Sequence, residues 1–201
     1  EGLRIEHLES FFKSINENIT PFIDKVIAAQ GERPAFLSAY VSTEDQIKLS
    51  EALMKHLTYD KSFGLLAFTE HPFSSTFSIN DSRITSHIHE DDFTQNIFSI
   101  IHEIGHSMYN HQVNPAYEGH ALANNMSYSM HESQSRLLEN MIGRSKAFWT
   151  PLYPQFVEII PEVLGNVSLD EYIRGINYVK KDFIRIEADE LTYPLHISVR
   201  Y

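Results

Sequence analysis

The sequence contains no cysteine in its 201 residues. It therefore has no disulfide, no thiolate nucleophile and no cysteine-based zinc or iron–sulfur site. Basic residues are also few: 16 lysines and arginines stand against 27 acidic residues, and the formal net charge is −11. This balance disfavours nucleic acid and anionic membranes as partners, because phosphate neutralisation requires basic side chains. No apolar run approaches the roughly 18–20 residues of a membrane span, and no signal-peptide pattern opens the chain, so we expect a cytoplasmic protein.

Histidine, in contrast, is abundant. Seven of the 11 histidines fall within 45 residues of sequence. They are His87, His89, His102, His106, His111, His120 and His131. Because cysteine is absent, any metal site must be built from histidine and carboxylate side chains.

Most of the sequence has the three- and four-residue apolar spacing of helices. Residues 3–18 and 21–29 predict two helices that are interrupted at a proline. Capping-box patterns predict the starts of helices over 43–58 and 168–190. The sequence therefore predicts a mainly α fold, in which residues 1–60 form a helical lead-in.

Two regions depart from this regular pattern. Three prolines between residues 141 and 164 predict only short helical pieces there. Residues 63–90 contain two aromatic-rich apolar runs followed by a turn, and they predict a small β-sheet. Within it, residues 83–89 alternate, with Arg83 and His87 on the same side. A solvated edge strand accounts for this alternation without any function.

The segment His102-Glu103-Ile104-Gly105-His106 lies inside a helical pattern. Its apolar stripe consists of Ile97, Ile101, Ile104 and Met108. His102 and His106 lie roughly opposite this stripe and one turn apart, so both imidazoles can reach one cation. Glu103 is offset to the side, where it can reach a metal-bound water without being a ligand.

Catalytic zinc usually takes three protein ligands and leaves one position for water. The extended HExxHxxGxxH pattern is excluded, because Tyr109 and Gln112 occupy its later positions. The alternative is a glutamate from a second helix over 124–144. The stripe predicted to be buried in that helix consists of Met126, Met130, Leu137 and Met141. Glu132 and Glu139 share a different face, and helical geometry alone does not select between them.

Five motifs together resemble those of the thermostable carboxypeptidase Taq family of metallocarboxypeptidases. In chain order they are HPF at 71–73, DxRxT at 81–85, HExxH at 102–106, HESQSR at 131–136 and IRxxAD at 184–189. The resemblance implies a mostly helical fold, a zinc ion with cobalt as the alternative, and removal of single C-terminal residues from peptides. It also makes Glu132 the third ligand beside His102 and His106, on metal-binding helices within 93–144.

Family members are about 500 residues long, which is longer than one typical domain. They also carry a later motif, GxxQDxHW, that is absent here. We therefore expect residues 1–201 to be a single catalytic-region fragment of a larger helical metallocarboxypeptidase. For the full-length protein a homodimer is also expected.

The expected reaction uses a zinc-activated water, with Glu103 as general base and then general acid. The expected partner is a peptide with a free C-terminus, whose carboxylate a guanidinium can bind bidentately. Arg83 and Arg185 are the candidates for this contact. Arg83 could instead form a structural ion pair with Asp81, and Arg185 could form one with Asp189.

Three further residues have expected roles at this site. His71 is a candidate for substrate binding or for stabilising the tetrahedral oxyanion. His131 and Asp189 are candidates for holding the metal ligands through hydrogen bonds. Two alternatives to the carboxypeptidase stay open: an oligoendopeptidase or aminopeptidase with the same HExxH-plus-Glu site, and a non-catalytic, metal-stabilised helical module.

Overall fold

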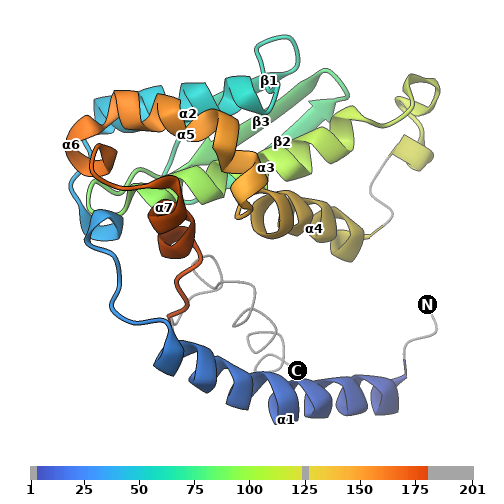
Figure 1. Cartoon of the computed structure of the whole chain (residues 1–201). Helices are drawn as coiled ribbons and strands as arrows, with labels where there is room; N and C mark the ends of the chain where they lie inside the picture. Colours follow the sequence, from blue (N-terminus) through green and yellow to red (C-terminus); the bar gives the residue numbers. More distant parts are fainter. Residues whose placement is uncertain (1–3, 124–126, 181–201) are drawn as a thin grey trace. The chain divides into compact units, whose positions relative to one another are not determined.

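The structure is a computed structural model that describes residues 4–123 and 127–180 of the chain. It is mainly helical with one small sheet, which confirms the predicted fold class (Figure 1). The chain forms two compact units, one from residues 1–33 and 177–201 and the other from Pro34–Ile176. Among the described helices, none is long and apolar enough to cross a membrane.

Helix α1, Ile5–Ala29, continues through Pro21 without a break. The predicted interruption at this proline is therefore wrong. A proline inside a helix removes the hydrogen bond to the carbonyl four residues earlier, which here belongs to Glu17. Both residues are exposed, so water can solvate the freed carbonyl and the helix continues.

The same unit pairs the end of α1 with the last described residues. The Gln30 side chain donates to the Val179 carbonyl at 2.6 Å and accepts from the Val179 N–H at 2.9 Å. The helix predicted over 168–190 ends earlier: α7 spans Leu169–Ile176, and Val179 bonds to the Gln30 side chain instead of a helical backbone. The IRxxAD motif lies outside the described residues.

The sheet predicted over 63–90 is confirmed in the second unit. Its strands are β1, Gly64–Phe68; β2, Phe73–Ser78; and β3, Asp81–Ser86. The order is β1-β3-β2, with β1 parallel and β2 antiparallel to β3.

Strand β3 is the middle strand, so the interpretation of residues 83–89 as a solvated edge strand is wrong. Ile84 is 1% exposed and Ser86 is fully buried. The Ser86 hydroxyl donates to the Asn96 side chain of the neighbouring helix α3 at 2.7 Å, which shows that α3 covers this part of the sheet. The strand ends at Ser86, and the two histidines that follow it lie in a loop.

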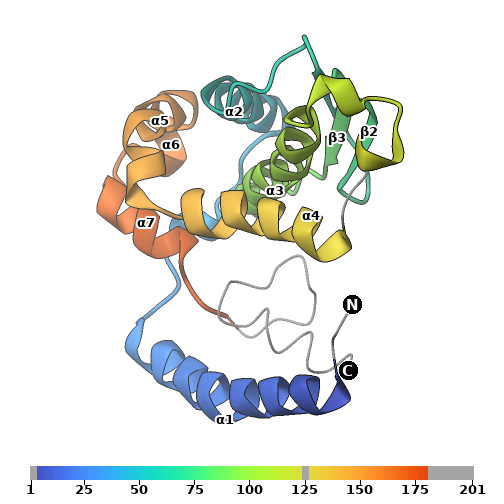
Figure 2. The ribbon, with the colours of Figure 1, turned by 90° about the vertical axis from the view of Figure 1, so that its right-hand side faces the viewer.

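Helix α2, Thr43–His56, confirms the helix predicted over 43–58. The Ser42 hydroxyl caps it by accepting from the N–H of Asp45 at 3.2 Å. Helix α5, Lys146–Ile159, lies beside α2 (Figures 1 and 2).

The prolines of α5 do not break it, in contrast to the prediction for residues 141–164. Pro151 and Pro154 both lie inside the helix, at a cost of about 3 kcal/mol each in a helix interior. The fully buried side chains of α5 are Trp149, Leu152 and Phe156. Each contributes about 1.5–3 kcal/mol by burial, so their combined burial is large enough to offset the local cost. Pro161 does start a separate short helix, α6, Pro161–Leu164.

Helix α3, Phe93–His111, lies between the sheet and α4, Tyr128–Arg136 (Figure 2). Helix α4 continues into η4, a π-helical segment at Leu137–Ile142, where the sequence predicts one regular helix over 124–144. The wider turn is visible in the bond from the Gly143 N–H to the Leu138 carbonyl, five residues earlier, at 2.7 Å. The remaining short helices are η1, Ala35–Ser38; η2, Pro115–Tyr117; and η3, Ala121–Ala123.

Candidate metal centre

The HExxH residues lie in the second half of α3. The isoleucine stripe of this helix is fully buried, as predicted, at Ile97, Ile101 and Ile104. On the other side, the rings of His102 and His106 are 4.8 Å apart between centroids and nearly perpendicular, at 81°. Both imidazoles are partly buried, so α3 offers two ring nitrogens at the boundary of the core.

Helix α4 packs very closely against this face of α3. Ser135 of α4 is fully buried, and a Cβ on Gly105 would lie only 2.6 Å from the Ser135 Cα. Glycine at position 105 therefore permits the short distance between the two helices. Glu132, which precedes Ser135 by three residues on α4, consequently reaches the histidines of α3.

The stripe predicted to be buried in this second helix is instead exposed. The exposed fractions are 47% for Met130, 46% for Leu137 and 65% for Met141, and Met126 lies outside the described residues. The prediction is wrong because the helix packs through its small and acidic residues. The small Ser135 allows close contact, and the carboxylates on its face meet imidazole partners.

The donor atoms of His102, His106 and Glu132 all lie within 4.8 Å of one another. Oε2 of Glu132 is 3.3 Å from Nε2 of His106 and 3.7 Å from Nε2 of His102. Ligand atoms about 2.0–2.1 Å from a tetrahedral zinc ion are about 3.3 Å from one another. The three side chains therefore fit a single ion. The structure places Glu132, and not Glu139, beside both Nε2 atoms.

Glu139 contacts the other edge of the His102 ring. Its Oε2 is 2.8 Å from Nδ1 of His102 and 3.2 Å from Nη1 of Arg136. Burial lowers the pKa of His102, but the hydrogen bond and charge of Glu139, together with the charges of Glu103 and Glu132, raise it by more. The net pKa of His102 is raised in the metal-free protein.

His131 contacts His106 in a similar position. Its Nδ1 meets Nδ1 of His106, and its Nε2 lies 3.3 Å from Oδ1 of Asn110. Asn110 in turn donates to the Thr76 hydroxyl of β2 at 2.9 Å. Burial and the neighbouring His106 lower the pKa of His131. The ring of His106 is thus connected through neutral groups to the sheet.

Glu103 is 7% exposed and lies on the side of α3 that faces the sheet. Burial raises its pKa, while the two neighbouring histidines and a hydrogen bond with Ser74 of β2 act in the opposite direction. The net shift is upward, so this carboxylate takes up a proton more readily than an exposed glutamate does.

The residues expected to bind substrate are less completely placed. The Arg83 guanidinium is bound bidentately by Asp81, at 2.9 and 2.8 Å, which is the ion pair that the sequence offers as an alternative. It also lies 4.8 Å from the centroid of the Phe77 ring. His71 is exposed in the loop between β1 and β2. Arg185 and Asp189 lie outside the described residues.

Several contributors to the site were missed by sequence reasoning. Gly105 lies within the HExxH segment. Its lack of a side chain is the sequence signal that could have indicated close packing against another helix. Arg136 acts through Glu139, three residues further along the chain, whereas Asn110 acts through His131 and Thr76, which are distant in sequence. The sequence offers Glu139 only as a competing ligand, and its seven-residue spacing from Glu132 does not indicate its contact with Nδ1 of His102.

The chain matches a known family along its whole length. Residues 1–201 match the carboxypeptidase Taq (M32) metallopeptidase family. The chain is 42% identical over 202 residues to carboxypeptidase 1 of Bacillus subtilis (strain 168), covering 100% of this chain and 40% of that protein. It is 36% identical over 201 residues to thermostable carboxypeptidase 1 of Thermus thermophilus, covering 99% and 39%.

Solved structures show the same similarity. The M32 carboxypeptidase from Deinococcus radiodurans R1 matches with a TM-score of 0.93 and 37% identity, over 100% of this chain and 40% of that one. Metallocarboxypeptidase 1 of Trypanosoma cruzi matches with a TM-score of 0.87 and 29% identity, also over 100% and 40%. The chain spans about 40% of the length of these relatives. It belongs to the carboxypeptidase Taq (M32) family of metallopeptidases.

Proposed function

We propose that this chain holds the metal centre of a metallocarboxypeptidase that releases C-terminal residues from peptides. The observation that carries the proposal is the convergence of His102, His106 and Glu132 at distances that suit one ion, in a chain of this family. Because the chain spans about 40% of its relatives' length, we propose that it is the metal-bearing portion of the family's fold.

Zinc is the proposed ion, with cobalt as the alternative. Two imidazole nitrogens and one carboxylate oxygen are a donor set of catalytic zinc sites, which keep a further position for water. Imidazole-rich sites also accept cobalt. When bound, the ion would polarise the scissile carbonyl and lower the pKa of water to about 7.

Glu103 is the proposed general base. It is next to a proposed ligand, His102, on α3, and its carboxylate would accept the proton of the attacking water and pass it to the leaving amine. A general base works best when its pKa approaches the working pH, and burial shifts the pKa of Glu103 in that direction.

The free carboxylate of the substrate needs a cationic partner. We propose Arg83, Arg185 and His71 as substrate contacts, and His131 and Asp189 as residues that hold the metal ligands. Asp81 already accepts hydrogen bonds from Nε and Nη2 of the Arg83 guanidinium, so a substrate carboxylate would have to share this group with Asp81.

A paired peptidase assay tests the proposal. The chain is offered N-blocked dipeptides with a free C-terminus and, separately, the same peptides with a C-terminal amide, with zinc or cobalt present and after chelation. We expect cleavage of the free acids that stops on chelation, and little cleavage of the amides. His106→Ala should lose both the ion and turnover.

Other outcomes would favour the alternatives. Equal rates on amidated peptides would refute the carboxypeptidase and favour an endopeptidase. A third set of peptides, with a free N-terminus and an amidated C-terminus, tests for an aminopeptidase, which would cleave this set alone. Binding of about one equivalent of metal without cleavage of any substrate would favour the non-catalytic helical module.

A further inference from the structure

The buried carboxylate of Glu139 is aimed at the back of one proposed metal ligand. Its Oε2 lies 2.8 Å from Nδ1 of His102. An ionised carboxylate only accepts hydrogen bonds, so His102 must donate from Nδ1. In the neutral ring the lone pair is then on Nε2, the nitrogen that faces Glu132. Glu139 therefore selects the tautomer that can bind an ion on the side of Glu132.

Arg136 forms an ion pair with this carboxylate. Glu139 is only 5% exposed, and a buried carboxylate without a cation is strongly disfavoured. The guanidinium of Arg136 is 3.2 Å from the same Oε2 and is itself largely buried. The carboxylate of Glu139 thus has a cationic partner of its own in addition to the His102 ring.

The backbone that presents Glu139 is unusual. Arg136 ends α4, and Glu139 belongs to the π-helical segment η4. π-Helical turns are rare and occur frequently at functional sites. Here the segment presents Glu139 to Nδ1 of His102, while Glu132, on the regular part of the helix, lies beside Nε2 of both histidines.

The second histidine lacks an equivalent anion among its described contacts. Its Nδ1 meets the imidazole of His131, and the connection continues to the neutral side chain of Asn110. The two proposed ligand histidines are therefore supported differently, His102 by a carboxylate and His106 by an imidazole.

We propose that Glu139 is a positioning residue that holds His102 with Nε2 free for the ion and strengthens this nitrogen as a donor. The inference rests on the proposed metal centre. Outer hydrogen-bond partners of this kind typically change metal affinity by 10- to 100-fold. The carboxylate of Glu139 should therefore make the chain bind its ion more tightly, without touching the ion or the substrate.

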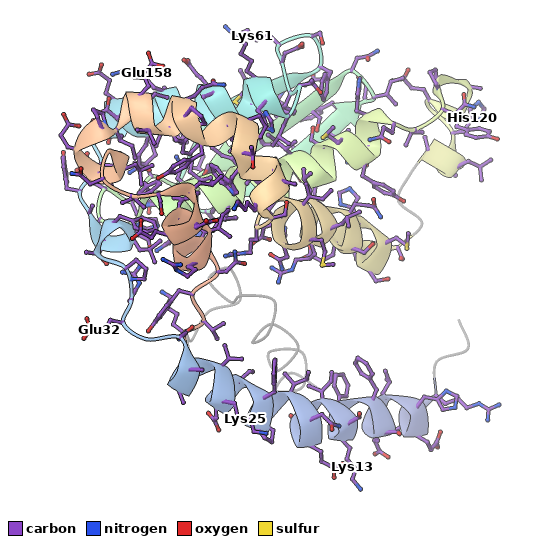
Figure 3. The ribbon with its side chains drawn as sticks, viewed as in Figure 1. Lys13, Lys25, Glu32, Lys61, His120 and Glu158 are labelled. Carbon is purple, nitrogen blue, oxygen red and sulfur yellow. The ribbon has the colours of Figure 1, made fainter. Side chains whose placement is uncertain are left out.

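The test measures zinc and cobalt affinity of the whole 201-residue chain by competition with a chelator. Glu139→Gln keeps an acceptor oxygen but removes the charge, and should weaken binding about 10-fold; Glu139→Ala removes both and should weaken it up to about 100-fold. The matched control is Glu158→Gln on α5, whose exposed side chain points away from the helices (Figure 3). Its affinity should stay within about twofold of wild type.

A spectroscopic measurement separates positioning from general stabilisation. In the zinc-loaded chain labelled with ¹⁵N-histidine, wild type should show His102 protonated at Nδ1 and coordinated through Nε2. Glu139→Gln should move the Nδ1 resonance of His102 and leave that of His106 in place. A residue that only stabilised the fold would lower the melting temperature without this selective shift.

The outcomes are distinguishable. Wild-type affinity in Glu139→Gln, or wild-type coordination through Nδ1 of His102, would overturn the inference; the second measurement needs no variant and is decisive even if the variants fail to fold. A wild-type chain that bound no ion would overturn the proposed metal centre and this inference with it. Tight wild-type binding with an unchanged variant would overturn the inference alone.

Discussion

Replacing Gly105 by alanine should damage both the fold and the metal centre, although alanine favours helices. The added Cβ would lie 2.6 Å from the Cα of Ser135, 3.1 Å from the Gln134 carbonyl oxygen and 3.3 Å from the Leu138 Cβ. The shortest of these contacts is to backbone, so no side-chain rotation can relieve it. Helices α3 and α4 must move apart instead.

The size of this effect follows from the contact distance. Carbon atoms pack at about 3.5–4.0 Å, so the helices must separate by about 1 Å. Overpacking of this kind costs about 1–3 kcal/mol, and the better helix propensity of alanine offsets about 1 kcal/mol of it. We expect a net loss of up to about 2 kcal/mol in the free energy of unfolding, or a melting temperature lower by up to about 8 °C.

The metal centre should be affected more strongly than the fold. Glu132 is on the helix that must move, and metal sites tolerate deviations of only about 0.2 Å in ligand distance. Zinc affinity should therefore fall at least about 10-fold, which is the smaller of the losses typical when the residues that orient metal ligands are changed.

Calorimetry and chelator competition measure the two effects separately. The matched control is Gly175→Ala on α7, where the new Cβ would meet the Phe36 ring at 2.2 Å. This variant should also lose stability, but its zinc affinity should equal that of wild type, because no proposed ligand belongs to α7. If Gly105→Ala bound zinc as tightly as Gly175→Ala does, the argument that close helix packing places Glu132 would be refuted.

Three further predictions concern individual side chains. Glu103→Gln should slow peptide hydrolysis by about 10²–10⁴-fold while chelator competition shows unchanged zinc affinity; loss of zinc would instead make Glu103 a group that holds the ion. Burial raises the pKa of Tyr153 to about 12, above its unfolded value of about 10. The stability from this neutral phenol is complete below about pH 10 and is lost towards about pH 12, so the difference in tyrosinate absorbance between wild type and Tyr153→Phe should develop together with the loss of circular dichroism there; a difference that develops while the circular dichroism of wild type is intact would contradict this. Ser145→Ala removes the cap that accepts from the Phe148 N–H at 3.2 Å and should cost about 1 kcal/mol in urea unfolding, whereas an unchanged midpoint would show that the cap contributes nothing.

The elements of the fold were predictable where local signals and packing agree. The helix that starts at Thr43 has its cap in the sequence, and the 63–90 sheet follows from its aromatic runs and turn. Pro151 and Pro154 were misleading, because a proline opposes the helix locally whereas the packing that overrides it is distant in sequence. Pro21 was misleading for another reason: it and Glu17 are exposed, so water can solvate the freed carbonyl. The burial of Trp149 against Tyr172, with centroids 4.7 Å apart, joins residues that no local window contains.

The candidate site was predictable on α3 and less so on α4. The positions of His102 and His106 follow from one helical turn, which is a local property. The face that α4 buries does not follow from its apolar residues, because Met130 and Met141 are exposed. The interface depends on shape: an absent side chain at Gly105 faces a small one at Ser135, and hydrophobicity does not encode that fit.

Glu132 and Glu139 show most directly why the regular spacing of a helix does not by itself predict the contacts of each residue. Regular helical spacing places Glu132 and Glu139 on the same face, which makes them equivalent candidates for one role. The structure assigns them to opposite edges of the His102 ring, with Glu132 near Nε2 and Glu139 on Nδ1. An imidazole has two distinct nitrogens, and a metal ligand needs one of them free and the other occupied. The same histidine thus contacts both acidic residues through different nitrogens, and the π-helical segment that begins at Leu137 is where their environments diverge.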